Sequence, residues 1–135
     1  MKIRGTDFVV YQVSDLGRAA AFYRETLGLP QEIYSEEYQW AEFNCGNVTL
    51  SLHGGMKLPK EPAGGRIALA VEDVPAAYAE LKSKGARVVG EPVDYTVCQA
   101  VEVLDPDGHT VILHHRADGT FGQNPGNAGS QGRPD

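Results

Sequence analysis

The chain has 135 residues, 41% of them hydrophobic, which is enough to build one domain with a core. A formal net charge of −6 without clusters of Lys and Arg argues against a nucleic-acid partner. No run of about 18 apolar residues and no basic leader with a long apolar core is present, so we expect a cytoplasmic protein without a membrane partner.

The first half of the chain predicts the element order βαβββ. Alternating apolar residues predict a strand at 7–13. Ser14 and Asp15 are N-cap residue types, and apolar residues at helical spacing follow until Gly28 and Pro30. Three more strands are expected, at 32–35, 38–44 and 48–53, with a tight turn at Cys45-Gly46 between the last two.

The second half predicts the same order again. A linker rich in Gly, Pro and Lys spans residues 54–65, and Asp73 can cap a helix that ends before Gly85. Strands are expected at 67–71, 86–89, 98–104 and 110–114. We therefore expect modules at 5–53 and 66–115 within one domain, 1–116. Residues 117–135 contain little apolar material and predict a disordered tail.

An internal repeat supports this division. The segment Val13-Ser14-Asp15-Leu16 aligns with Val71-Glu72-Asp73-Val74, which indicates two copies of one unit.

Several short motifs resemble the vicinal-oxygen-chelate superfamily, which includes glyoxalase I, bleomycin-resistance proteins and extradiol dioxygenases. They are Val13-Ser14-Asp15-Leu16, Ala21-Phe22-Tyr23, Leu27-Gly28-Leu29 and Asp105-Pro106-Asp107-Gly108. The resemblance implies an α+β fold of paired βαβββ modules, whose curved mixed sheet surrounds a cavity with the helices on its outer face. It also implies a homodimer.

The resemblance further implies where a metal would bind, because metal-dependent members carry His or Gln in the opening strand of each module and Glu in its closing strand. These positions correspond here to Phe8, Ser51, Arg66 and Ile112, none of which is a usual metal ligand. We therefore expect no metal ion and no cofactor. A relocated metal site at His53 or His114, each two residues past a lost ligand position, stays open.

Hairpin geometry predicts which side chains line the cavity. A two-residue loop at Cys45-Gly46 places Glu42 opposite Thr49, Trp40 opposite Ser51 and Tyr38 opposite His53. A three-residue loop at 106–108 places Glu102 opposite Ile112. The predicted lining is Phe8, Gln12, Tyr38, Trp40, Glu42, Ser51, Arg66, Glu102 and Ile112.

Aromatic rings beside carboxylates can hold a flat or cationic ligand without a metal, whereas Arg66 suits an anionic group, so the sign of the ligand's charge is open. The leading hypothesis is metal-independent binding of a small organic molecule, possibly an antibiotic that is sequestered unchanged. The alternative is a glyoxalase-like lyase, isomerase or dioxygenase that uses a displaced metal or a general base, Glu42 or Glu102. A third hypothesis is a catalytically silent assembly domain.

Overall fold

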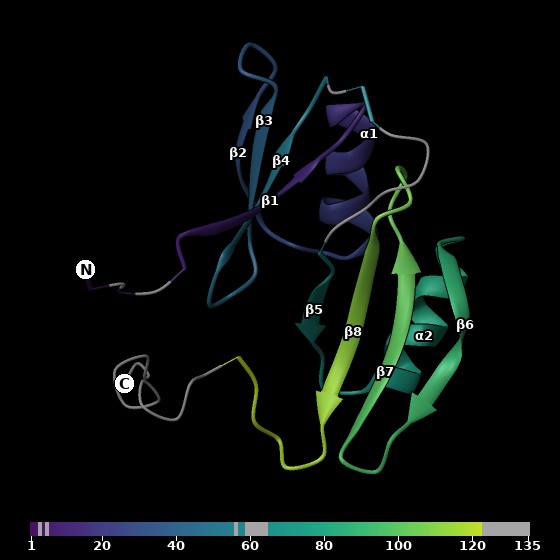
Figure 1. Cartoon of the computed structure of the whole chain (residues 1–135). Coiled ribbons are helices and arrows are strands. Elements are labelled where there is room, and N and C mark those ends of the chain that lie inside the picture. The colour runs from purple at the N-terminus through teal and green to yellow at the C-terminus, as the bar shows by residue number, and fades with distance from the viewer. Residues whose placement is uncertain (3, 5, 56, 59–64, 123–135) are drawn as a thin grey trace.

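The computed structural model describes residues 1–122 except 3, 5, 56 and 59–64. Its first module begins with β1 (Phe8–Gln12) and α1 (Leu16–Ala21), which continues as the π-helical segment η1 (Phe22–Thr26). Three strands follow: β2 (Gln31–Ser35), β3 (Trp40–Asn44) and β4 (Thr49–His53). They form a four-stranded sheet in the order β1-β4-β3-β2, in which β1 is parallel to β4 and the other pairs are antiparallel (Figure 1).

The second module repeats this arrangement with β5 (Ile67–Ala70), α2 (Val74–Ser83), β6 (Arg87–Asp94), β7 (Cys98–Leu104) and β8 (Thr110–Arg116). Its sheet has the order β5-β8-β7-β6, again with one parallel pair, β5 and β8. The α+β class and the twofold βαβββ repeat are therefore confirmed. Most of the linker predicted at 54–65 lies outside the described residues.

Both helices begin where the sequence predicts. The Asp15 carboxylate accepts a hydrogen bond from the backbone N–H of Arg18 (3.0 Å), and that of Asp73 accepts one from Ala76 (2.9 Å). Each bond satisfies a backbone donor that the first helical turn leaves free. The repeated Asp caps thus fix equivalent strand-to-helix turns in the two modules.

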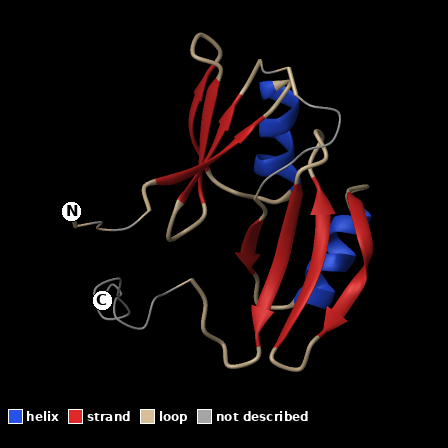
Figure 2. Cartoon of the chain, viewed as in Figure 1, coloured by secondary structure: helices blue, strands red, loops and turns tan. Residues whose placement is uncertain are grey.

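Each sheet buries one face and leaves the other open. The buried faces share one hydrophobic core with the helices, in which Phe43, Leu50, Val103 and Val111 are fully buried. The opposite faces carry half-exposed apolar side chains, and no helix of the described chain covers them (Figure 2). Alternation along the strands therefore separates a core face from an open face in both modules.

The two sheets form no closed barrel, and across the described residues no strand of one sheet pairs with a strand of the other. Instead, the end of the first helix packs against the turn between β7 and β8. The Tyr23 hydroxyl donates to the buried Asp105 carboxylate (2.9 Å), and the Ser14 hydroxyl donates to Asp107 (2.5 Å). Lys84, just after α2, donates to the carbonyl of Thr26 (3.1 Å). This junction holds the modules together through polar contacts.

The predicted register of the first hairpin differs from the structure by two residues. Glu42 lies opposite Ser51 and Trp40 opposite His53, because the loop spans 45–48 rather than two residues. Gly46 takes a positive φ of 96° in this loop, and its N–H donates to the Asn44 side chain (2.6 Å). A shift of two residues keeps every side chain on its predicted face. In the second hairpin, Glu102 lies opposite Ile112 as predicted.

Beyond β8, residues 117–122 form a turn that reaches the first module. The Ala117 N–H donates to the Val97 carbonyl (3.0 Å), and the Asn47 side chain donates to the Gly122 carbonyl (2.7 Å). The rest of the predicted tail, 123–135, lies outside the described residues. The described part of the chain holds no helix of the length and apolarity needed to cross a membrane.

Candidate functional site

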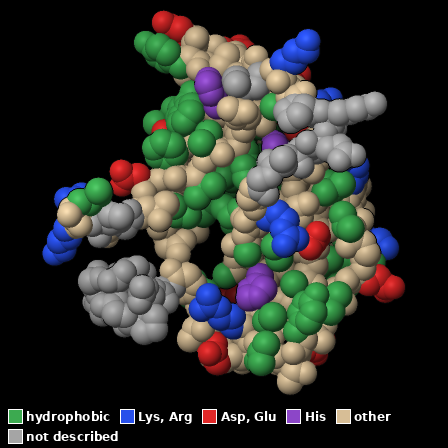
Figure 3. Space-filling view, in the orientation of Figure 1, with side chains coloured by type: hydrophobic (Ala, Val, Ile, Leu, Met, Phe, Trp, Pro, Cys, Tyr) green, Lys and Arg blue, Asp and Glu red, His purple; other side chains and the backbone are tan. Residues whose placement is uncertain are grey.

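The open face of the first sheet gathers aromatic and polar side chains from three neighbouring strands. We call this surface, formed by Phe8, Val10, Trp40, Glu42 and Ser51, the Trp40 face. The Phe8 and Trp40 rings meet edge to face, with centroids 5.9 Å apart. The Trp40 indole N–H donates to Glu42 Oε2 (2.8 Å), which fixes the tryptophan beside a carboxylate. Figure 3 shows hydrophobic side chains gathered over this sheet.

Ser51 occupies the middle of the Trp40 face, between Val10 of β1 and Glu42 of β3. Its side chain is fully buried, and its hydroxyl has no hydrogen-bond partner among the described residues. A buried hydroxyl without a partner costs about 1–3 kcal/mol, so such a group is expected to have a further partner in the working protein. The geometry thus supplies a polar group beside Val10 and Glu42, on a face that also carries aromatic rings.

Exposed apolar side chains lie on the same face of the sheet as Ser51. Phe8 is 49% exposed, Val10 43% and Ile33 47%, although Val10 and Ile33 lie in the middle of their strands; Phe8 begins β1. Ile33 lies opposite Glu42 and therefore faces the same side of the sheet. Val10 and Ile33 are not among the lining residues predicted from the sequence, although alternation with Phe8 alone places Val10 on this face.

The second sheet carries a separate group of predicted lining residues. Arg66 forms an ion pair with Glu102 (3.1 Å), and Ile112 lies beside Glu102 on the neighbouring strand. Both charged side chains are partly exposed, at 56% and 38%. At that exposure the pair contributes little to stability. Its main effect is that Arg66 and Glu102 neutralise each other.

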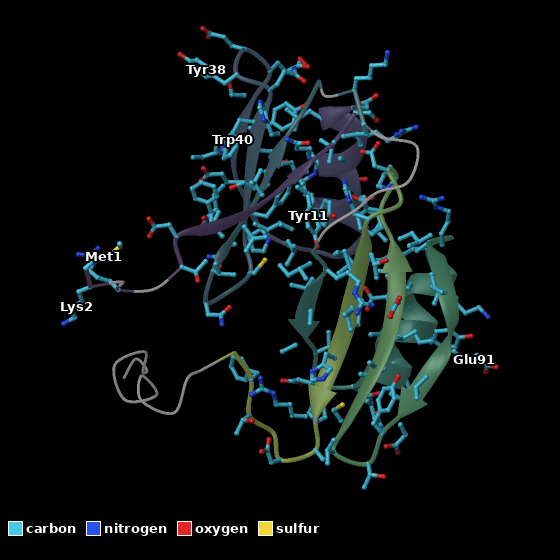
Figure 4. All side chains as sticks on the ribbon, viewed as in Figure 1. Met1, Lys2, Tyr11, Tyr38, Trp40 and Glu91 are labelled. Carbon is cyan, nitrogen blue, oxygen red and sulfur yellow. The ribbon has the colours of Figure 1, made fainter. Side chains whose placement is uncertain are left out.

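The nine predicted lining residues therefore fall into two groups and one outlier. Phe8, Gln12, Trp40, Glu42 and Ser51 lie on the first sheet; Glu102 and Ile112 lie on the second, and Arg66 directly precedes its strand β5. Tyr38 is in the turn before β3 rather than in a strand, and is 72% exposed (Figure 4). The two groups thus belong to different sheets, whose strands do not pair with each other over the described residues.

The side chains at the four expected ligand positions do not fit a divalent metal. Phe8 and Ile112 offer hydrocarbon, Arg66 offers a cation, and Ser51 offers a neutral hydroxyl. Over the described residues, no three or more His, Cys, Asp or Glu side chains are grouped so that they could hold an ion. His53 and His114 belong to different sheets, and His53 lies beside Trp40, with ring centroids 5.8 Å apart.

A pocket lies at the end of β8. It has a volume of about 530 Å³ and is lined by His114, Arg116 and Phe121, with Ala68 and Ala70 on its other side. Neither Arg116 nor Phe121 was predicted from the sequence to line a pocket. The one feature that could have indicated it is that Phe121 is a lone aromatic residue in a polar segment.

Buried titratable groups concentrate at the junction between the modules rather than on the Trp40 face. Burial raises the pKa of Asp105 above its ordinary value of 3.8, although the backbone N–H of His109 and the Tyr23 hydroxyl partly offset this rise. Burial and the nearby Asp105 charge raise the pKa of Tyr23 far above its ordinary value. Burial also raises the pKa of Tyr11. These groups hold the modules together and line neither open face.

The paired βαβββ modules and their open sheet faces define a protein of the glyoxalase fold. Residues 5–113 match the family model of the Glyoxalase/Bleomycin resistance protein/Dioxygenase superfamily. The chain belongs to this superfamily.

Individual relatives have different activities. Lactoylglutathione lyase GLX1 of Arabidopsis thaliana is 30% identical over 121 residues, which cover 80% of this chain but 43% of the relative. The chain thus spans less than half the length of that protein. Metallothiol transferase FosB of Staphylococcus haemolyticus is 28% identical, covering 83% of this chain and 84% of the relative.

A solved structure, that of TnmS3, an antibiotic binding protein from Streptomyces sp. CB03234, superposes with a TM-score of 0.72. It is 27% identical to this chain and covers 87% of this chain and 99% of its own.

Proposed function

We propose that this chain binds a small organic molecule on the Trp40 face without the help of a metal ion. The observation that carries the proposal is the buried Ser51 hydroxyl, which has no partner among the described residues and lies between Val10 and Glu42 on the Trp40 face. Small-molecule sites combine apolar and aromatic walls with a few placed polar groups. Ser51, Glu42 and the Trp40–Phe8 corner supply both parts.

The four substituted ligand positions support metal independence, because a hydroxyl is the only neutral donor that they retain. The likeness to an antibiotic binding protein supports sequestration of an intact ligand such as an antibiotic. The relatives named as a lyase and a metallothiol transferase support the alternative, an enzyme with a displaced metal or a glutamate base. Cytoplasmic location and the absence of a nucleic-acid partner stay predictions.

We also propose that the working unit is a homodimer. Val89 and Val93 are 48% and 46% exposed on the open face of the second sheet, much as Phe8 and Val10 are on the first. In addition, β1 and β5 are edge strands, each paired on one side only in the described chain. A second copy would cover apolar faces and free edges at once. Sedimentation equilibrium that shows a monomer at high micromolar concentration would contradict this proposal.

Metal analysis and ligand titration together test the binding proposal. We expect purified protein to contain no stoichiometric zinc, nickel, iron or manganese. We expect the fluorescence of Trp40, the sole tryptophan, to change when a panel of aromatic compounds is titrated. Trp40→Ala should weaken binding by about 1–3 kcal/mol, the loss expected for an aromatic anchor. A bound metal whose removal abolishes turnover would instead establish the enzyme alternative.

A further inference from the structure

We propose that the ligand of the Trp40 face is an organic cation that carries a flat ring. This inference rests on the proposed function and specifies the charge of the molecule that binds there. The sequence alone leaves that charge open, because Arg66 and Glu42 both belong to the predicted lining. In the structure Glu42 lies on β3 of the first sheet, whereas Arg66 directly precedes β5 of the second sheet and pairs with Glu102 of β7.

The charge of Glu42 is not neutralised on its own face. The ion pairs of the described chain join Arg24 to Glu25, Arg66 to Glu102 and Lys84 to Glu80, and none includes Glu42. Arg66, the basic residue of the predicted lining, is held by Glu102 on the second sheet. The Trp40 face therefore presents a net negative charge at a partly buried position, where pairing with a cation is stronger than in bulk water.

The groups around Glu42 favour an aromatic cation over a metal ion. Trp40 already donates to Oε2 of Glu42, which leaves Oε1 to accept from a ligand. The indole face attracts positive charge through its quadrupole, and the neighbouring Phe8 ring adds an apolar wall. One carboxylate beside two rings lacks the oxygen ligands that a hard cation needs.

Ser51 provides an independent indication of a ligand at the same point. It is the strand neighbour of Glu42, its side chain is fully buried, and its hydroxyl has no described partner. The hydroxyl is closed to solvent in this structure, so a ligand N–H would donate to it once a neighbouring side chain of the Trp40 face shifts, while the ligand's positive charge pairs with Glu42. An anionic ligand would instead place like charge against Glu42, where repulsion opposes binding.

Three probes of one shape and different charge test the inference. Benzamidine, benzamide and benzoate carry the same ring with a positive, neutral and negative group. Each is titrated into the full-length protein, and the NMR resonance of the Trp40 indole N–H, the single signal of its kind, reports binding. We expect benzamidine to bind about tenfold more tightly than benzamide, and benzoate to bind most weakly.

Two variants locate the charge effect. Glu42→Gln keeps an acceptor for the Trp40 N–H but removes the negative charge, so benzamidine should lose its advantage while benzamide binding persists. Glu91→Gln makes the same charge change on β6, far from Trp40 (Figure 4), and should leave the tenfold preference in place.

The outcomes separate the two proposals. The inferred positive charge of the ligand is wrong if benzamide or benzoate binds as tightly as benzamidine, or if Glu42→Gln still prefers benzamidine. Binding on the Trp40 face stands in either case. If none of the probes and no member of the aromatic panel perturbs Trp40, the proposed function itself fails.

Discussion

The bond between Tyr23 and Asp105 is the sharpest test of how the modules are joined. Both side chains are fully buried, and Asp105 Oδ2 accepts from the Tyr23 hydroxyl at 2.9 Å. Oδ1 keeps two backbone donors, Asp107 N (2.9 Å) and His109 N (2.8 Å). Tyr23→Phe therefore removes one of three bonds to a buried carboxyl group. The ring contacts of Tyr23 with its aromatic neighbours can be retained.

We expect Tyr23→Phe to lower the free energy of unfolding at neutral pH by about 1.5–3 kcal/mol, the usual range for a bond to a charged group. Urea denaturation followed by circular dichroism gives this difference, with the m-value checked for a change in cooperativity. Tyr78→Phe is the matched control. Its hydroxyl only accepts a bond from Lys82 at the surface (3.3 Å), so its effect should stay below about 0.5 kcal/mol. Equal stabilities of Tyr23→Phe and the parent protein would refute the reasoning.

Three further outcomes follow from the same structure. Burial raises the pKa of Asp105 in the folded protein above its ordinary value of 3.8. The stability that its protonated form contributes is therefore fully present below pH 3.8 and is lost as the pH rises through the raised pKa. In urea titrations the parent should therefore gain stability relative to Asp105→Asn as the pH falls from 7 towards 4. A stability difference between the two proteins that does not change with pH would contradict this prediction. Gly54→Ala should lower the stability of the protein by about 1–3 kcal/mol in thermal melts, because the added Cβ would lie 2.7 Å from Leu16 Cβ. An unchanged melting temperature would mean that the chain at residue 54 moves away from Leu16 without cost. Deleting residues 118–135 should lower the free energy of unfolding by less than about 1.5 kcal/mol, since the described contact of this segment with Asn47 is exposed; a larger loss would show that the segment docks firmly.

Local signals explain why the element order could be predicted. Asp15 and Asp73 each cap a helix directly after a strand, and these two caps carry the repeat. Such signals act within a few residues and need no tertiary contact. The same holds for the second hairpin, where the turn at 106–108 fixes the register that brings Glu102 opposite Ile112.

Features that depend on tertiary contacts were predicted less well from the sequence. The first hairpin depends on whether Gly46 adopts its positive φ within a four-residue loop, and two glycine-containing turns of different length are both compatible with the sequence. β6 continues to Asp94, beyond the predicted 86–89, because the irregularity between Val89 and Val93 interrupts the alternation without ending the strand. Asp105 was identified only as a turn residue, since its buried partner Tyr23 is 82 positions away.

The predicted lining residues fall on two sheets for the same reason: their placement depends on tertiary structure. This has a consequence for function. Alternation correctly assigns Trp40, Glu42 and Glu102 to open faces, but it cannot say whether two open faces of one chain meet. The junction through Tyr23 and Asp105 holds the first helix against the β7–β8 turn through a buried bond. In the proposed dimer a second copy would add its own open faces to those of the first, and a ligand would then touch residues of both copies. The proposed dimer and the proposed site are thus linked: a strictly monomeric protein would have to bind its ligand with the residues of one chain alone.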